Sequence, residues 1–341
     1  MKTGILLVNL GTPDSPSVSD VKKYLTEFLM DGRVIDIPYI KRTLLVKGII
    51  VPFRSVKVAR EYKKLWMDEG SPLLVYGKSL ALKLKNRFNQ QGTKTSVQLA
   101  MRYQNPSIEK ALNNLRKQNV DKIIVFPLFP QYASATTGSV AEEVMRLVSQ
   151  WTVIPSIEMI NYYHDKKEYI DAFAEKTGND ILKLKPDHVL FSYHGIPERH
   201  LYNIQKENNK QCGFPACECQ IKAKNKPYCY RSACFRTSEL IAAKLGISNF
   251  STSFQSRLGK DPWIQPYTDE SIIGLTKMGI KKLLVVSPSF VADCLETTLE
   301  IGEEYRELFL EHGGEQFNYT ESLNDSEIWV EGVYQMLMER L

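Results

Sequence analysis

The sequence predicts an α/β fold made of two similar domains, each built around a parallel β-sheet. Short continuous runs of Val, Ile and Leu, typical of buried parallel strands, alternate with stretches of helical periodicity. The segment 110–126 also lines up with 270–286, an offset of 160 residues. Alternating strand and helix signals favour open parallel sheets with right-handed crossovers. The internal repeat indicates that this architecture occurs twice.

Six segments have the form of buried strands, and a helix-like stretch lies between most neighbours. In chain order they are residues 4–10, 97–101, 122–129, 188–193, 250–254 and 282–287. A strand ending in Gly also repeats, because GILLVNLG at 4–11 matches HVLFSYHG at 188–195. Parallel sheets of this kind bind ligands outside the carboxyl ends of their strands. Residues that follow each run are therefore the candidates for function.

The domain boundaries follow from this pattern. We expect an N-terminal domain over 1–155, a C-terminal domain over 156–320 and a C-terminal helix over 321–341, with the active-site cleft between the two domains. A length of 341 residues exceeds the usual limit of a single hydrophobic core. The stretch 203–230 is polar, rich in Lys and Cys, and has no apolar periodicity, so it is expected to be an insertion held by something other than a core.

Composition and charge exclude several classes of protein. Apolar residues make up 43% and charged residues 24%, which disfavours both disorder and a membrane-spanning bundle. The net charge of +5 is too small to indicate a nucleic-acid partner. The N-terminal apolar run is too short for a signal peptide, and no later run reaches the roughly 20 residues of a spanning helix. The expected compartment is the cytoplasm.

Residues 28–54 combine apolar side chains with basic ones. This mixture is typical of an apolar lip on a ligand pocket, or of a surface that contacts anionic lipid headgroups peripherally at the inner membrane. An amphipathic helix that covers the sheet is the alternative.

His194 leaves the fourth predicted strand and is followed by Gly195 and, after one residue, Pro197, which bend the chain. An imidazole at the mouth of a sheet suits proton transfer or metal contact near neutral pH. A histidine that only bonds to the backbone at the strand end is the alternative.

Carboxylates follow the last predicted strand at helical spacings of three and four. They are Asp293, Glu296, Glu300, Glu303 and Glu307. On one helix they would form an acidic ridge, either as a path for divalent cations or as a solvated face. Arg102 with Tyr103, and Trp263 near Arg257, would line a flat anionic ligand by stacking and ion pairing, unless their rings belong to the core.

Five of the six cysteines fall within 23 residues, and only Cys294 lies elsewhere. They are Cys212, Cys217, Cys219, Cys229 and Cys234. In a reducing compartment such a cluster indicates metal ligation before disulfides.

Taken together, these motifs resemble the ferrochelatases, which insert ferrous iron into protoporphyrin at the end of haem synthesis. The resemblance covers almost the whole chain apart from the Cys-rich insertion and is closest to the proteobacterial type. It rests on residues 7–13, 62–72, 129–132, 136–138, 192–197, 254–257, 262–263 and 293–296.

The resemblance implies two Rossmann-like domains of the chelatase fold with a porphyrin between them. It implies that His194 and Glu296 contact the iron and accept pyrrole protons, with Glu300 and Asp293 extending the acidic ridge behind them. Arg102, Tyr103 and Trp263 correspond to pocket-lining positions. Many animal members have a second histidine where this chain has Cys294, so a role assigned to that histidine does not transfer. The loop at 11–14 lacks the glycine patterns that hold nucleotide phosphates.

Some members of the family carry a [2Fe-2S] cluster in an internal Cys-rich segment. Four thiolates complete such a cluster, and Cys212, Cys217, Cys219 and Cys229 are the first choice, because Cys234 precedes a stretch in which cluster-free relatives often also have a cysteine. A structural zinc is the competitor. Two other functions stay open: a chelatase for Co²⁺ with sirohydrochlorin or Fe²⁺ with coproporphyrin, and a non-catalytic Fe-S sensor.

Overall fold

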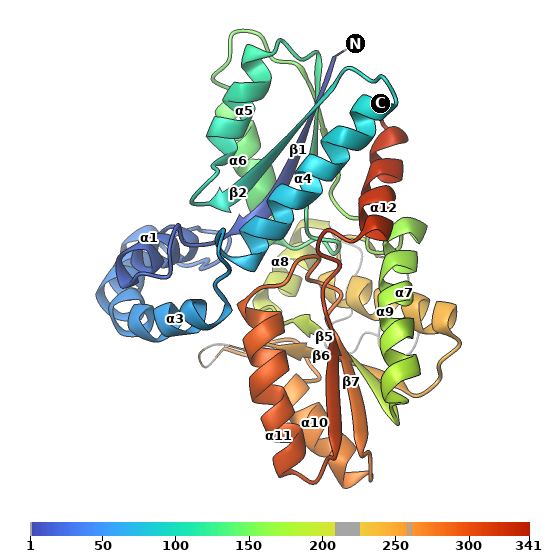
Figure 1. The fold of residues 1–341 in the computed structure, drawn as a ribbon. Coiled ribbons are helices and arrows are strands. Elements are labelled where there is room, and N and C mark those ends of the chain that lie inside the picture. The colour runs from blue at the N-terminus through green and yellow to red at the C-terminus, as the bar shows by residue number, and fades with distance from the viewer. Residues whose placement is uncertain (1, 209–225, 258, 260) are drawn as a thin grey trace. The chain divides into compact units, whose positions relative to one another are not determined.

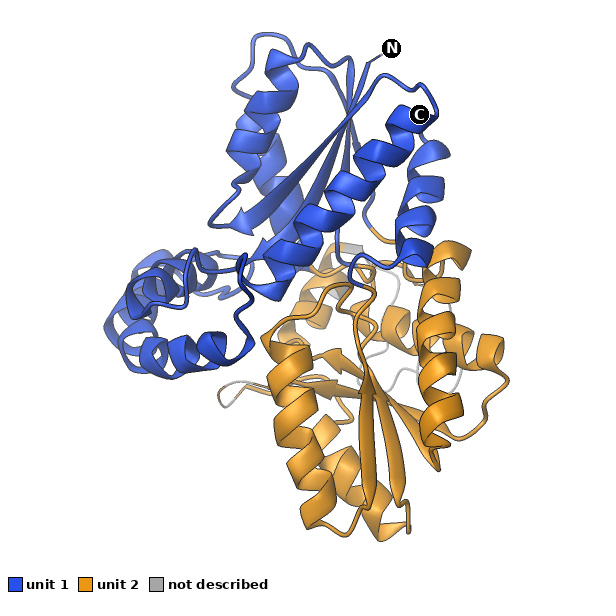
Figure 2. Cartoon of the chain, viewed as in Figure 1, with its two compact units in different colours: residues 1–129, 134–161, 324–341 blue, residues 130–133, 162–323 orange. Residues whose placement is uncertain are grey.

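The structure, a computed structural model, describes residues 2–208, 226–257, 259 and 261–341. The chain forms two compact units, coloured separately in Figure 2. Unit 1 comprises residues 1–129, 134–161 and 324–341, and unit 2 comprises residues 130–133 and 162–323. The chain thus enters unit 2 briefly at Pro130–Ala133, passes to it again after Asn161 and returns to unit 1 at Asn324.

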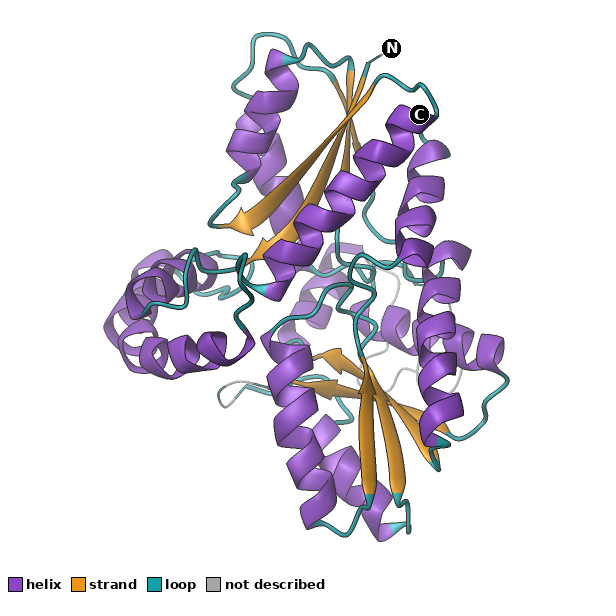
Figure 3. Ribbon diagram, in the orientation of Figure 1, coloured by secondary structure: helices purple, strands orange, loops and turns teal. Residues whose placement is uncertain are grey.

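Unit 1 contains a parallel four-stranded sheet in the order β2-β1-β3-β4. Its strands are β1 (Thr3–Gly11), β2 (Thr95–Tyr103), β3 (Lys122–Pro127) and β4 (Ser156–Met159). The central strand β1 is buried almost throughout because it has a neighbour on each side and helices on both faces (Figure 3).

Helices cover both faces of this sheet (Figure 1). α5 (Ile108–Lys117) and α6 (Ser139–Val148) enclose one core, in which Leu115 and Val144 are fully buried against the strands. α4 (Pro72–Gln90) and α12 (Glu327–Met338) pack together on the other face, where the rings of Phe88 and Tyr334 lie 4.9 Å apart. Serine side chains cap the first turns of α4 and α5, which fixes where both helices begin.

A helical lobe, defined as residues 18–65, is inserted between β1 and α4. It consists of α1 (Val18–Leu29), α2 (Tyr39–Leu45), a π-helical turn η1 (Val46–Ile50) and α3 (Val51–Leu65). The lobe has a small core of its own around Leu29, Val46 and Val51. It therefore packs largely within itself and needs a separate connection to the sheet.

Unit 2 repeats the topology, with a parallel sheet in the order β6-β5-β7-β8. Its strands are β5 (His188–His194), β6 (Phe250–Gln255), β7 (Lys282–Val286) and β8 (Gln316–Thr320). α10 (Thr268–Lys277), the π-helix η4 (Glu296–Tyr305) and α11 (Arg306–Glu311) contribute to one core around Phe309. α7 (Lys167–Leu184) and α9 (Tyr230–Leu245) pack against each other, and α8 (Glu198–Asn208) follows β5.

All six predicted strands are confirmed, as is the predicted repeat, since α5 with β3 and α10 with β7 hold equivalent places in the two sheets. The sequence did not predict β4 and β8, each of which lies at one edge of its sheet. Both are short and mostly half-buried, so they lack the continuous apolar run that marks a central strand.

Candidate active site

The carboxyl end of β5 holds the backbone of His194 firmly. His194 pairs in register with Gln255 of β6, and the Gly195 N–H donates to the Gln255 carbonyl at 2.8 Å. The Tyr230 hydroxyl donates to the His194 carbonyl at 2.8 Å. A Cβ on Gly195 would lie 2.9 Å from the Gln255 carbonyl oxygen, so glycine is required where β5 turns away from β6.

The imidazole of His194 is half-buried and oriented by its own backbone. Nδ1 lies 2.6 Å from the Gly195 carbonyl, which only accepts, so Nδ1 is the donor. In the neutral ring Nε2 therefore carries the lone pair, and that atom is able to accept a proton or bind a metal. The rings of Trp263 and Phe290 each lie 6.3 Å from the imidazole, centroid to centroid. The structure thus brings the predicted pocket residue Trp263 to the predicted catalytic histidine.

Gln255 connects the end of β5 to the start of η4. Its Nε2 donates to the Glu296 carbonyl at 3.3 Å, and its Oε1 accepts from the Ser192 hydroxyl at 2.6 Å. Gln255 is 2% exposed, so this connection is part of the interior. Gln255 thus pairs with His194 through its backbone and contacts Glu296 through its side chain, although His194 and Glu296 lie 102 positions apart.

Glu300 lies behind this pair and is held by several donors. Its carboxylate accepts from the Ser256 N–H and the Tyr305 hydroxyl, both at 2.9 Å, and from the Ser256 hydroxyl. Burial raises the pKa of Glu300 and outweighs these hydrogen bonds. The charges of His194 and Glu296 both act on Glu300, in opposite directions, so the three groups belong to one electrostatic site.

The acidic ridge differs from the predicted continuous α-helix. Asp293 lies before the helix begins, and its carboxylate accepts from the Ser322 N–H and the Thr297 hydroxyl, each at 3.1 Å. It therefore acts as a structural acceptor and is 8% exposed. Residues 296–305 form a π-helix, whose wider turn changes which side chains share a face. Glu303 and Glu307 are exposed.

Cys294 occupies the turn between β7 and η4, beside Glu296. Burial, together with the Glu296 charge, raises the pKa of its thiol well above the usual range. The thiol is therefore protonated at physiological pH and does not serve as a base there.

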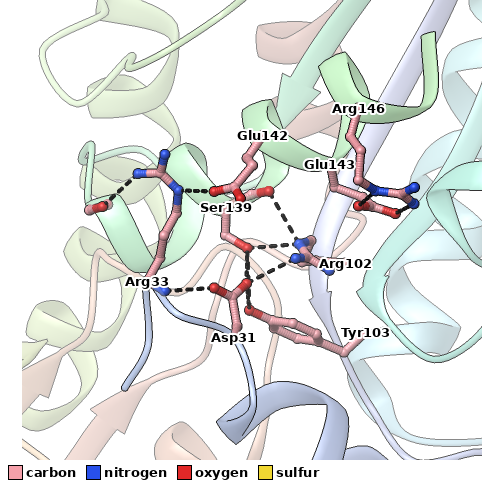
Figure 4. Close-up of polar contacts among 9 residues, drawn as sticks. Asp31, Arg33, Arg102, Tyr103, Ser139, Glu142, Glu143 and Arg146 are labelled. Atoms are coloured by element: carbon pink, nitrogen blue, oxygen red, sulfur yellow. Dashed lines mark hydrogen bonds and ion pairs between the residues drawn. The ribbon is translucent and has the colours of Figure 1, made fainter. Parts of the chain in front are cut away.

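Arg102 and Tyr103 lie in unit 1, where the structure places them in an internal network (Figure 4). The Arg102 guanidinium forms an ion pair with Asp31 at 2.9 Å, and the Tyr103 hydroxyl donates to the same carboxylate at 2.9 Å. Tyr103 is fully buried. The resemblance implies that these two residues line the pocket; in the structure the polar atoms that form these contacts bind protein groups.

Three of the predicted cluster cysteines, Cys212, Cys217 and Cys219, lie outside the described residues. Cys229 is the N-cap of α9 and is 7% exposed, whereas Cys234 lies inside that helix and is fully buried. Burial raises the pKa of Cys234 well above the usual range. Of the predicted cluster cysteines, the two that the structure describes therefore differ in position: Cys229 lies at the start of α9 and Cys234 lies inside it.

Within residues 2–208, 226–257, 259 and 261–341, no three His, Cys, Asp or Glu side chains gather closely enough to hold a metal ion. No helix in that part is long and apolar enough to span a membrane.

Sequence reasoning missed the residues that support the site. Tyr230 and Tyr305 contact the backbone of His194 and the carboxylate of Glu300, and Asp31 pairs with Arg102. Asp31 lies within the predicted lip, and Tyr230 directly follows Cys229. No sequence pattern at either position predicts the residue that it contacts.

Comparisons with known proteins agree over the full length. The family model for ferrochelatases matches residues 2–341. A ferrochelatase from Legionella pneumophila strain Corby is 44% identical over all of both chains. One from Coxiella burnetii strain Dugway is 42% identical over the whole chain and 94% of that protein. Ferrochelatase 2 of Shewanella oneidensis is 41% identical over 96% of this chain and 94% of its own.

Solved structures show the same fold. SirB from Bacillus subtilis, determined with Fe³⁺, has a TM-score of 0.56 and 13% identity over 99% of this chain and 95% of its own. CbiX, described as the terminal enzyme of sirohaem biosynthesis in denitrifying bacteria, has a TM-score of 0.50 and 9% identity over 99% of both chains. At these identities the likeness concerns the fold alone.

Proposed function

This chain belongs to the ferrochelatase family, and we propose that His194 and Glu296 carry its reaction. The enzyme inserts Fe²⁺ into a porphyrin in haem biosynthesis. Insertion requires that two pyrrole N–H protons leave while the hydrated cation sheds water. The observation that supports the pair is the buried Gln255 amide, which joins the ends of β5 and η4 where the two residues lie.

His194 is suited to accept a pyrrole proton at Nε2. Its Nδ1–H is held by the Gly195 carbonyl, which fixes the tautomer and leaves the Nε2 lone pair for the substrate. Trp263 and Phe290 flank the ring and are able to stack against a flat macrocycle. Binding energy from such contacts helps to distort a planar ring so that its nitrogen lone pairs become accessible.

Glu296 is proposed to contact the incoming cation, since a carboxylate is a ligand that a hydrated divalent ion accepts readily. Burial raises the pKa of Glu300, so its carboxyl holds a proton more readily than an exposed glutamate, and we assign it the relay of protons to and from the site. Asp293 serves in this scheme to hold the turn before η4.

An anaerobic insertion assay with Fe²⁺ and protoporphyrin IX tests this proposal. His194→Ala is expected to lower kcat by roughly 10²–10⁴-fold, the usual contribution of a general base. His188→Ala is the matched control, because it removes a histidine from the other end of β5, where Nε2 lies 2.8 Å from the Ser251 hydroxyl. Equal activity of the two variants would refute the role of His194.

The same assay separates the alternatives. If Fe²⁺ enters coproporphyrin, or Co²⁺ enters sirohydrochlorin, faster than Fe²⁺ enters protoporphyrin IX, the assignment of the substrate must change. An Fe-S sensor without chelatase activity is excluded if His194→Ala abolishes insertion while the visible spectrum of the protein stays unchanged.

A [2Fe-2S] cluster on Cys212, Cys217, Cys219 and Cys229 is a second proposal. Cluster ligands must be thiolates, and Cys234 is fully buried with its pKa raised by that burial, which argues against it as the fourth ligand. Cys229 lies at the start of α9, directly after the half-exposed Tyr228, at the end of the Cys-rich segment.

Anaerobically purified protein is expected to be reddish-brown. Cys229→Ser should remove the visible absorbance, whereas Cys234→Ser, the matched control, should retain it. Metal analysis decides between iron and zinc: a colourless protein that holds one zinc per chain and keeps full activity would overturn the cluster. Loss of colour in the Cys234 variant alone would move the fourth ligand there.

Peripheral contact with a membrane is a third proposal, and it concerns the helical lobe. Apolar side chains on α2, η1 and α3 are strongly exposed, among them Ile40 at 74%, Leu44 at 69% and Phe53 at 80%. The exposed basic residues Lys47 and Arg54 belong to the same stretch of the sequence as these exposed apolar residues. Apolar side chains interspersed with basic ones fit the interface of an anionic bilayer.

Sedimentation with vesicles tests this contact. The protein should bind vesicles that contain phosphatidylserine or phosphatidylglycerol, and the double variant Ile40→Ser, Phe53→Ser should lose that binding. Met278→Ser removes a side chain of equal exposure, 79%, from unit 2 and is the control. Binding that the double variant retains would contradict the proposal.

A further inference from the structure

A buried polar network of unit 1 centres on Asp31, which follows the end of α1. Its side chain is 7% exposed. One carboxylate oxygen, Oδ2, accepts from the Ser139 hydroxyl at 2.5 Å, from Arg102 Nη2 at 2.9 Å and from the Tyr103 hydroxyl at 2.9 Å. The other, Oδ1, accepts from the Arg33 N–H at 2.7 Å. Figure 4 shows these donors converging on the carboxylate from separate elements.

The donors compensate for the burial of the charge. Burial alone raises the pKa of Asp31, but the hydrogen bonds from Ser139, Arg33 and Tyr103, together with the charge of Arg102, outweigh it and lower the pKa. The carboxylate is therefore ionised at any physiological pH. Removing a partner from such a network leaves an unpaired buried charge.

Arg102 is held in this arrangement through Nε and Nη2. Its Nε donates to the Ser139 hydroxyl at 2.7 Å, Nη2 donates to Asp31, and the guanidinium lies 4.7 Å from the centre of the Tyr103 ring. The side chain is 17% exposed. These contacts describe a structural cation whose charge is neutralised within the protein.

The network joins the helical lobe to the sheet of unit 1. Asp31 begins the turn that leads from α1 toward α2, because its carbonyl accepts from the N–H groups of Val34 and Ile35. Its partners belong to β2 and α6, which are parts of the α/β layers. Arg33 adds a second connection from the same turn, to Ser134 at 3.0 Å and to Glu142.

We propose that Asp31 is a positioning residue that fixes the helical lobe on the sheet of unit 1 in the orientation that binds porphyrin. The proposal rests on the proposed function and on the expectation from the sequence that residues 28–54, which lie within the lobe, form a lip of the porphyrin pocket. Arg102 then acts through Asp31 and Ser139, and a direct ion pair between Arg102 and a porphyrin carboxylate is the competing account that the experiments must separate.

Asp31→Asn keeps the shape of the side chain but leaves Arg102 unpaired. A charge-assisted hydrogen bond is worth about 10-fold or more in an equilibrium, so the fraction of correctly placed lobe falls and the KM for porphyrin should rise about 10-fold. The kcat should change less than about twofold, because the residues proposed for chemistry belong to unit 2. Asp20→Asn is the control, since it removes an ion pair with Lys23 on the same α1 helix and should alter neither constant.

Amide hydrogen exchange of the intact chain gives a readout without iron or turnover. Asp31→Asn should speed exchange over residues 39–65 by about 10-fold and leave unit 2 unchanged. Equilibrium binding of protoporphyrin, followed by its fluorescence, should weaken in parallel with KM. These two measurements test Asp31 even if His194 fails the insertion assay, so the two proposals fail separately.

A double-mutant cycle decides what Arg102 does. If Arg102 acts through Asp31, the pair Asp31→Asn, Arg102→Gln should raise KM no more than Asp31→Asn alone. Additive increases would show that Arg102 contacts porphyrin directly and would overturn the proposal, as would an unchanged KM and exchange rate in Asp31→Asn. If that variant does not fold, Ser139→Ala decides the question: a KM raised about threefold supports the proposal, and an unchanged KM overturns it.

Discussion

Replacing Gly195 with alanine tests how precisely the end of β5 places His194. The new Cβ would lie 2.9 Å from the Gln255 carbonyl oxygen and 3.1 Å from Cε3 of Trp263. Both distances are below ordinary contact, and one neighbour is backbone that cannot rotate away. The chain at residue 195 must therefore move away from β6, and the adjacent imidazole moves with it.

The structure sets the scale of the effect. Inserting a methyl group into a filled site costs about 1–3 kcal/mol, and the hydrogen bond from Gly195 to Gln255 adds about 1 kcal/mol if it breaks. Since each kcal/mol shifts the melting temperature of a unit of this size by about 2–4 °C, we expect a fall of roughly 2–16 °C. A displacement of His194 by about 1 Å should lower kcat by up to about 100-fold.

The assay combines calorimetry with anaerobic iron insertion. Gly274→Ala is the control: it lies in α10, its Cβ would meet no atom within 4 Å, and alanine should stabilise that helix by up to about 1 kcal/mol. A Gly195→Ala protein with the melting temperature and kcat of the control would refute the argument that the β5 end positions the imidazole.

Three further predictions concern other parts of the chain. Burial raises the pKa of Glu300 above 4.5, so the charged form destabilises the folded state, and Glu300→Gln should gain stability relative to wild type as the pH rises through that pKa in urea titrations; a constant difference would contradict this. The pKa of Asp31 is lowered, so its stabilisation is present above about pH 3.8 and is lost as the pH falls further; the difference in unfolding free energy between wild type and Asp31→Asn should shrink only in that acid range. Phe309→Ala should lower the free energy of unfolding by about 3–5 kcal/mol because that ring is fully buried, and a loss below about 1 kcal/mol would be inconsistent with its place in the core.

The repeat explains why the fold could be predicted so far. Central strands such as β1 and β5 are buried on both faces, so their composition alone identifies them, and equivalent segments of the two units carry the same pattern. The edge strands β4 and β8 are short and mostly half-buried, so their sequences are constrained less than those of β2 and β6, which are also edge strands but are longer and more buried.

The site residues also fall into those that the sequence predicted and those that it did not. His194 ends the buried strand β5, Glu296 begins η4 after the loop that follows β7, and both belong to recognisable motifs, so the sequence was sufficient to select them. Their partners were not predictable, because Tyr230 and Tyr305 reach the site from helices whose direction is set by packing. The turn of η4 also depends on tertiary contacts, since its carboxylates have the spacing of an ordinary α-helix.

The sequence by itself determined the central strands and the helices between them, the duplication and the family, because local periodicity and contiguous motifs are sufficient to identify each of these. Only the tertiary structure decided which charges are neutralised inside the protein. Arg102 and Asp31 are 71 positions apart, and no local pattern connects them. An ion pair between such residues forms because folding removes both from water at the same point, and that cost is met only when the partners and their hydrogen-bond donors arrive together.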